Sequence, residues 1–149
     1  MLRYLVTGLP VIVLCLSMEA AIVAACLRKY SKFRHAHGHG ASAWTDIILL
    51  SMVMLLTLAA NCAQIAIWAG LFMVLGEFDT FAAAFYHSCV NFVTLGYGDI
   101  VMSERWRLLG PLEGANGILM FGISTSVMTA AVFDVIKYSA KKTEGDGKG

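Results

Sequence analysis

The chain has 149 residues, of which 58% are hydrophobic and only 14% are charged. This composition is too apolar for an ordinary soluble domain and predicts an all-α membrane protein. The net charge of +1 says little by itself, because orientation in a membrane depends on the side at which Lys and Arg gather. No nucleophile is paired with a base, so we expect no enzyme, and nothing indicates nucleic-acid binding.

The first apolar run covers residues 4–27 and is interrupted only by Glu19. It is long enough to cross a bilayer as a helix, which needs about 20 residues. A cleaved signal peptide is one alternative, and residues 23–26 also resemble a lipobox. The run is longer than the ~7–15 residues of a signal core and carries a carboxylate. We therefore expect residues 1–27 to form an N-terminal transmembrane helix.

A basic segment follows within residues 28–44 and contains Arg28, Lys29, Lys32 and Arg34. The positive-inside rule places this linker in the cytoplasm and the amino terminus outside. Three histidines alternate through it: His35, His37 and His39. They could bind a metal ion or sense pH. A flexible, solvated linker is the preferred interpretation.

A second membrane span is predicted over residues 46–75, where Asn61 and Gln64 lie one helical turn apart. Unsatisfied amides are costly in lipid, so both should face protein. We interpret them as hydrogen-bonding partners of another helix, with the first helix as a candidate, and less favourably as ion ligands.

The four cysteines fall in apolar segments without CxxC or zinc spacing: Cys15, Cys26, Cys62 and Cys89. This pattern favours small buried hydrophobic side chains over disulfides or metal ligands.

A short apolar run at residues 80–93 cannot span a bilayer, and Asp79 or Thr80 can cap it as a helix. The hexapeptide 94–99 follows it: Thr94, Leu95, Gly96, Tyr97, Gly98 and Asp99. If right-handed and left-handed dihedrals alternate along this stretch, successive carbonyls point the same way, and glycine suits the left-handed positions. Four such strands around an axis would surround K⁺ with the carbonyls of residues 94–97 and the Thr94 hydroxyl. A Gly-rich turn between two membrane helices is the alternative.

The last span is predicted over residues 108–138, followed by a disordered tail at 139–149. Glu113 and Asn116 near its start could hydrogen-bond the preceding short helix or the hexapeptide backbone. Further along, one helical stripe could line a cavity and an inner gate; it contains Phe121, Thr125, Met128 and Val132. Asp134 lies near the cytoplasmic end, where it could form an acidic ring or pair with a nearby lysine.

The hexapeptide and its position between two spans resemble the pore module of potassium channels, over about residues 49–138. The resemblance divides residues 45–138 into outer helix 46–75, pore helix 80–93, selectivity filter 94–99 and inner helix 108–138. It implies three transmembrane helices, a re-entrant pore helix and a homotetramer with C4 symmetry, in which each chain contacts three copies of itself and the lipid bilayer.

The same resemblance implies roles for single residues. Tyr86 and His87 would support the filter, and Gly117 would be the gating hinge, with close helix packing as the equal alternative. Some members pair the last aspartate of the motif with a carboxylate on the pore helix. Here that position is Val90, so Asp99 lacks that partner.

The expected function is passive, K⁺-selective conduction across the plasma (inner) membrane, with the carboxyl terminus in the cytoplasm. K⁺ would be the permeant ion and no cofactor is expected. Two alternatives remain at this stage: a weakly selective cation channel, and a non-conducting regulatory or sensor subunit with a pore-like fold.

Overall fold

The computed structural model describes the backbone of residues 2–37 and 43–146 and the side chains of 2–29, 44, 45 and 47–137. Within these residues the regular structure is entirely helical, as four helices. They are α1 (Leu2–His37), α2 (Ala43–Val74), α3 (Phe81–Phe92) and α4 (Leu109–Asp146). Three of them contain spans long and apolar enough to cross a membrane: Leu2–Lys29, Ile47–Val74 and Leu109–Lys137. The prediction of an all-α fold with three long apolar helices suited to spanning a membrane is therefore confirmed.

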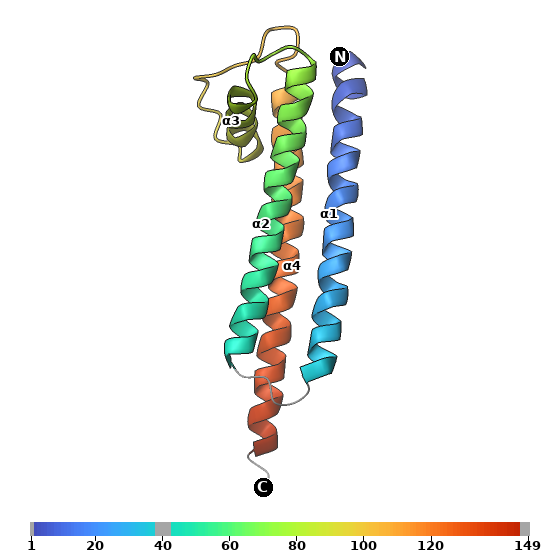
Figure 1. The fold of residues 1–149 in the computed structure, drawn as a ribbon, viewed down its shortest axis with the longest axis vertical. Coiled ribbons are helices and arrows are strands. Elements are labelled where there is room, and N and C mark those ends of the chain that lie inside the picture. Colours follow the sequence, from blue (N-terminus) through green and yellow to red (C-terminus); the bar gives the residue numbers. More distant parts are fainter. Residues whose placement is uncertain (1, 38–42, 147–149) are drawn as a thin grey trace.

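The three long helices lie side by side, as Figure 1 shows. α1 and α4 run in the same direction and α2 runs in the opposite one. The short helix α3 packs against α2 and α4 near the end of the bundle that also holds the amino terminus. The carboxyl terminus lies at the other end, so the bundle has an α3 end and a far end.

Two helices extend further than the sequence predicted. α1 continues from the expected end at residue 27 to His37, and α4 continues through the expected tail to Asp146. Neither extension contains an internal proline, and most residues of both extensions tolerate or favour a helix. The expected boundaries followed the apolar run, whereas a helix can continue into water beyond it. The side chains of His35, His37 and His39 lie outside the described residues, so their role stays a prediction.

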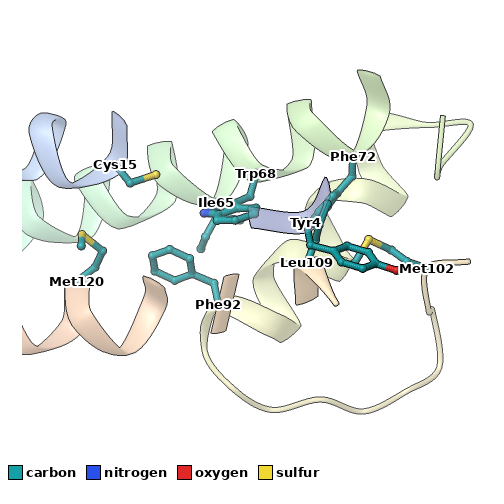
Figure 2. Close-up of a cluster of buried hydrophobic side chains, with 9 residues drawn as sticks. All are labelled: Tyr4, Cys15, Ile65, Trp68, Phe72, Phe92, Met102, Leu109 and Met120. Atoms are coloured by element: carbon teal, nitrogen blue, oxygen red, sulfur yellow. The ribbon is translucent and has the colours of Figure 1, made fainter. Parts of the chain in front are cut away.

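A cluster of buried side chains fixes α3 to the bundle (Figure 2). It draws on every helix and on the loop before α4, through Tyr4, Cys15, Ile65, Trp68, Phe72, Phe92, Met102, Leu109 and Met120. Trp68, Phe72 and Phe92 are fully buried. Since lipid is itself apolar, this contact is stabilised mainly by close packing.

The start of α1 is also attached to the loop that precedes α4. The rings of Tyr4 and Trp106 meet edge to face, with centroids 6.0 Å apart. The guanidinium of Arg3 lies 4.8 Å from the Tyr4 ring centroid and 5.7 Å from that of Trp106. Such cation–π contacts fasten the amino terminus to the α3 end.

The four cysteines are all free, but they are not all buried. Cys15 and Cys26 are buried and Cys89 is half-buried, as expected for small apolar side chains. Cys62 is exposed, so its predicted burial is wrong. It lies on the outer face of α2, because its neighbours Asn61 and Gln64 face the bundle.

Candidate functional site

Thr80 begins the short helix that leads to the hexapeptide. Its backbone is extended, with φ −130° and ψ 143°, and its hydroxyl accepts a hydrogen bond from the Ala83 amide at 3.3 Å. This is the geometry of a helix N-cap, so one of the two predicted caps is confirmed. The cap sets the direction in which α3 leaves the end of α2.

The far end of α3 holds the beginning of the hexapeptide through main-chain hydrogen bonds. The Thr94 amide donates to the Asn91 carbonyl at 2.8 Å, and the Leu95 amide donates to the Val90 carbonyl at 2.9 Å. The Gly96 amide also approaches the Val90 carbonyl, at 3.4 Å. Val90 therefore contacts the segment through its carbonyl oxygen, while its side chain is buried.

The backbone beyond α3 has a left-handed conformation at every second residue. The φ angles are +61° at Thr94, +61° at Gly96 and +74° at Gly98. Thr94 is the only non-glycine residue with positive φ in the described chain, and its Cβ makes that conformation costly by roughly 1–2 kcal/mol. The two glycines were predicted at left-handed positions. The alternation begins at Thr94, two residues before Gly96. Residues 93–99 are all exposed in the single chain.

Asp99 has a partner that the sequence analysis missed. The Tyr86 hydroxyl on α3 donates a hydrogen bond to its carboxylate, with 2.7 Å between the oxygens. This bond lowers the pKa of Asp99 and raises the pKa of Tyr86. The Val90 position offers no carboxylate, and a tyrosine one turn earlier on α3 binds Asp99 instead.

His87 lies between two elements and is hydrogen-bonded on both ring nitrogens. Its Nδ1 is 2.8 Å from the Ile100 carbonyl oxygen and its Nε2 is 2.8 Å from the Asn91 amide nitrogen. Because a carbonyl can only accept, Nδ1 carries the proton and Nε2 accepts from Asn91. Burial lowers the pKa of His87, although the bond to Ile100 opposes this. The ring also packs against Phe72 and Phe78, with centroids 5.6 and 5.0 Å away.

Asn91 connects this histidine to α4. Its amide nitrogen also lies 3.4 Å from a carboxylate oxygen of Glu113, which is fully buried. An amide nitrogen has two hydrogens, so it can donate to His87 and Glu113 together. The expected contact between Glu113 and the short helix is confirmed, whereas Asn91 itself gave no signal in the sequence.

A second carboxylate holds the loop after the hexapeptide. Glu77, in the turn before α3, accepts from the Ser103 amide at 2.6 Å and from the Ser103 hydroxyl at 2.7 Å. The turn before α3 and the loop after residues 94–99 are thus attached to each other. This pair spans 26 residues, and no spacing rule predicts it.

The glycines of α4 form the surface on which the end of α3 rests. A Cβ added to Gly114 would lie 3.3 Å from the Asn91 carbonyl oxygen, and one added to Gly117 would overlap the Phe92 carbonyl oxygen. Gly110 would meet the Asn91 side chain at 3.2 Å. Close packing, one of the two interpretations of Gly117, explains why a glycine occurs at this position. Its hinge role stays a prediction.

The residues expected to line a cavity and inner gate lie along α4 beyond this surface. Phe121 and Thr125 are exposed, and Met128 and Val132 are half-buried. The Phe121 ring contacts that of Phe92, with centroids 5.6 Å apart.

Asp134 lies on another side of α4. It lines a cavity of about 200 Å³ between the long helices, together with Cys26, Leu27, Val53, Val127, Ala130 and Ala131. The cavity belongs to the contact between α1, α2 and α4 rather than to the stripe that begins at Phe121.

One of three comparisons with known proteins found a match. A family model described as "Ion channel" matches residues 62–134, which run from the second half of α2 through α3 and the hexapeptide into α4. The comparisons with curated proteins and with solved structures gave no match. The family match covers most of the segment in which the resemblance was found, about residues 49–138, and leaves out α1. Residues 62–134 of this chain therefore match the ion channel family.

Proposed function

We propose that this protein is a K⁺-selective channel of the plasma (inner) membrane and that four copies form its pore with C4 symmetry. Residues 94–98 are its selectivity filter, and K⁺ binds between carbonyl oxygens of Thr94, Leu95, Gly96 and Tyr97. α3 is the re-entrant pore helix, and α4 is the inner helix.

The observation that carries this proposal is the alternating sign of φ from Thr94 to Gly98. When left- and right-handed residues alternate, carbonyl oxygens of consecutive residues point to one side of the strand. A ring of such carbonyls can replace the hydration shell of K⁺. An ordinary turn between two helices needs one or two left-handed residues, whereas here three occur at every second position.

The number of ligands supports the proposal of a tetramer. One chain supplies one strand, and a ring of carbonyls around an ion needs several strands related by a closed rotation. The exposure of Leu95 and Tyr97, at 56% and 67%, leaves this segment accessible to neighbouring copies. Tyr97 would then brace the ring from outside.

Orientation is proposed from charge. Arg28 and Lys29 lie at the far end of α1, and Lys137 at the far end of α4. The positive-inside rule assigns this end to the cytoplasm and the α3 end to the exterior. The filter then faces outward, and the amino terminus lies on the same side.

Flux through purified protein in liposomes tests the proposal, with Rb⁺ or K⁺ compared with Na⁺. Gly96→Ala should abolish K⁺ selectivity or flux while tetramers still form. A Cβ at Gly96 meets no atom within 4 Å, so the only strain comes from φ +61°. Gly76→Ala is the matched control, because Gly76 has φ +72° and equally open surroundings but lies outside the filter.

Three outcomes would contradict the proposal. Equal Na⁺ and K⁺ flux through the wild type would indicate a weakly selective cation channel. Intact tetramers without flux would indicate a non-conducting subunit. Unchanged selectivity in Gly96→Ala would exclude residues 94–98 as the filter.

A further inference from the structure

Four polar side chains from the three long helices meet inside the bundle. Gln64 on α2 donates a hydrogen bond to Glu19 Oε2 on α1, with 2.9 Å between nitrogen and oxygen. Ser124 Oγ on α4 donates to Glu19 Oε1 at 3.3 Å and accepts from Asn61 Nδ2 at 3.4 Å. The predicted role of the two amides as helix-to-helix partners is confirmed, and Glu19 is the residue they surround.

This cluster is buried between the three apolar spans. Glu19 and Gln64 are fully buried, and Asn61 and Ser124 are 6% and 9% exposed. All four residues lie well inside the apolar spans, more than a helical turn from either end. Water is therefore excluded from the carboxyl group of Glu19.

The surroundings of Glu19 offer no positive charge. α2 presents two neutral amides and α4 presents a hydroxyl, and on α1 the ionisable side chains to either side are the Cys15 and Cys26 thiols. Among the side chains that the structure describes, Glu19 makes no ion pair, and Arg28 lies nine residues on, about 14 Å along the helix. A carboxylate buried without a counter-charge costs several kcal/mol, more than two neutral hydrogen bonds return.

The cluster also has more acceptors than donors. Asn61 Oδ1 and Gln64 Oε1 are buried without a hydrogen-bond partner. A carboxylate at position 19 would add two further acceptors. One additional hydrogen on Glu19 supplies the cluster with one more donor, and Gln64 Oε1 keeps no hydrogen-bond partner.

We propose that Glu19, Gln64, Ser124 and Asn61 form a proton-binding site inside the membrane, with the proton held on Glu19. The bond between Ser124 and Glu19 then reverses, so that Oε1–H donates to Ser124 Oγ, and Oε2 continues to accept from Gln64. The Ser124 hydroxyl then donates to Asn61 Oδ1, once the Asn61 amide is turned so that its oxygen takes the place of its nitrogen. Amide orientation is assigned from such networks. This one gives the Asn61 oxygen a donor and places the Asn61 amide nitrogen in the buried position that the oxygen occupies in the structure.

The site connects α1 to the family segment. Glu19 and Asn61 lie outside residues 62–134, whereas Gln64 and Ser124 lie inside them. A neutral Glu19 can hold α1 against α2 and α4 without a charge in lipid. The inference does not depend on K⁺ selectivity or conduction.

Infrared difference spectroscopy tests the protonation directly. Full-length wild type and Glu19→Gln are compared in liposomes at neutral pH. The wild type should show a carbonyl band of a protonated carboxyl group that the variant lacks. Glu104→Gln is the control, because Glu104 is exposed in the loop before α4 and its replacement should remove carboxylate bands. Loss of carboxylate bands in Glu19→Gln would overturn the proposal.

Thermal unfolding of the same proteins gives an independent readout. A glutamine has the shape of a protonated glutamate and can accept from Gln64 while donating to Ser124. Glu19→Gln should therefore melt close to the wild type, and Glu19→Ala should melt lower, because it leaves the buried amide and hydroxyl unpaired. If Glu19→Gln melts as low as Glu19→Ala, the site requires a charged carboxylate with a bound cation, and the proton assignment is wrong.

Discussion

At the scale of single residues, the protonation state of His87 depends on Asn91. The two hydrogens of the Asn91 amide point to His87 Nε2 and to Glu113, so Nε2 must stay unprotonated. A proton on Nε2 would face the amide donor and break the connection between α3 and α4. Burial and this contact act in the same direction, and both keep His87 neutral.

The resulting prediction concerns stability in acid. The folded-state pKa of His87 is lowered, so the free energy of unfolding should fall as the pH drops below the ordinary histidine value of ~6.5. The fall should end once the pH passes the folded-state pKa. Its slope should reach at most about 1.4 kcal/mol per pH unit, the value for one proton.

His87→Gln is the informative variant, because its amide can donate to Ile100 and accept from Asn91 as neutral histidine does. Denaturant unfolding at a series of pH values should give a shallower dependence in this window than the wild type shows. The histidines outside the described side chains remain in both proteins, so the difference isolates His87. Identical pH dependence would show that His87 is protonated equally in the folded and unfolded states.

At the scale of secondary-structure elements, the contact between α3 and α4 depends on small residues. Gly110, Gly114 and Gly117 lie on one face of α4, where the carboxyl-terminal end of α3 rests. The sequence indicated close packing or a hinge for Gly117. The position of the Phe92 carbonyl, which depends on how α3 is tilted, explains the glycine through packing, and the hinge stays a prediction.

We expect Gly117→Ala to destabilise the protein, because the new Cβ would overlap the main chain of Phe92. Overpacking of this kind costs about 1–3 kcal/mol. Gly122→Ala is the control on the same helix, where an added Cβ meets no atom within 4 Å. It should be neutral or stabilising by up to about 1 kcal/mol, since alanine favours a helix. Thermal unfolding in detergent compares the two, and equal melting temperatures would contradict the packing role.

At the scale of the whole molecule, periodic and compositional features were predictable and long-range side-chain pairs were not. Apolar runs located the three spans, and the glycine spacing located two left-handed residues of the hexapeptide. The bonds from Glu77 to Ser103 and from Tyr86 to Asp99 depend on how a loop closes, which local spacing does not encode. Likewise, Glu19 was identified as an interruption of an apolar run, but its partners became evident only from the packing of three helices.

The arrangement of the helices gives the last prediction, which concerns topology. Arg3 contacts the Trp106 ring at the α3 end, and Lys137 lies at the far end of α4. Positions 3 and 105 should therefore lie on one side of the membrane and position 137 on the other. Charge assigns the first side to the exterior.

Single cysteines at these three positions test it in a background without native cysteines, which is needed because Cys62 is exposed. Arg3, Arg105 and Lys137 are themselves exposed, so a membrane-impermeant maleimide can reach each replacement from its own side. On intact cells, positions 3 and 105 should be labelled, and position 137 only after the membrane is opened. Labelling of position 137 alone on intact cells would show that the protein has the same fold in the opposite orientation. Labelling of positions 3 and 105 from opposite sides would contradict the contact between Arg3 and Trp106, and with it the packing of α1 beside α4.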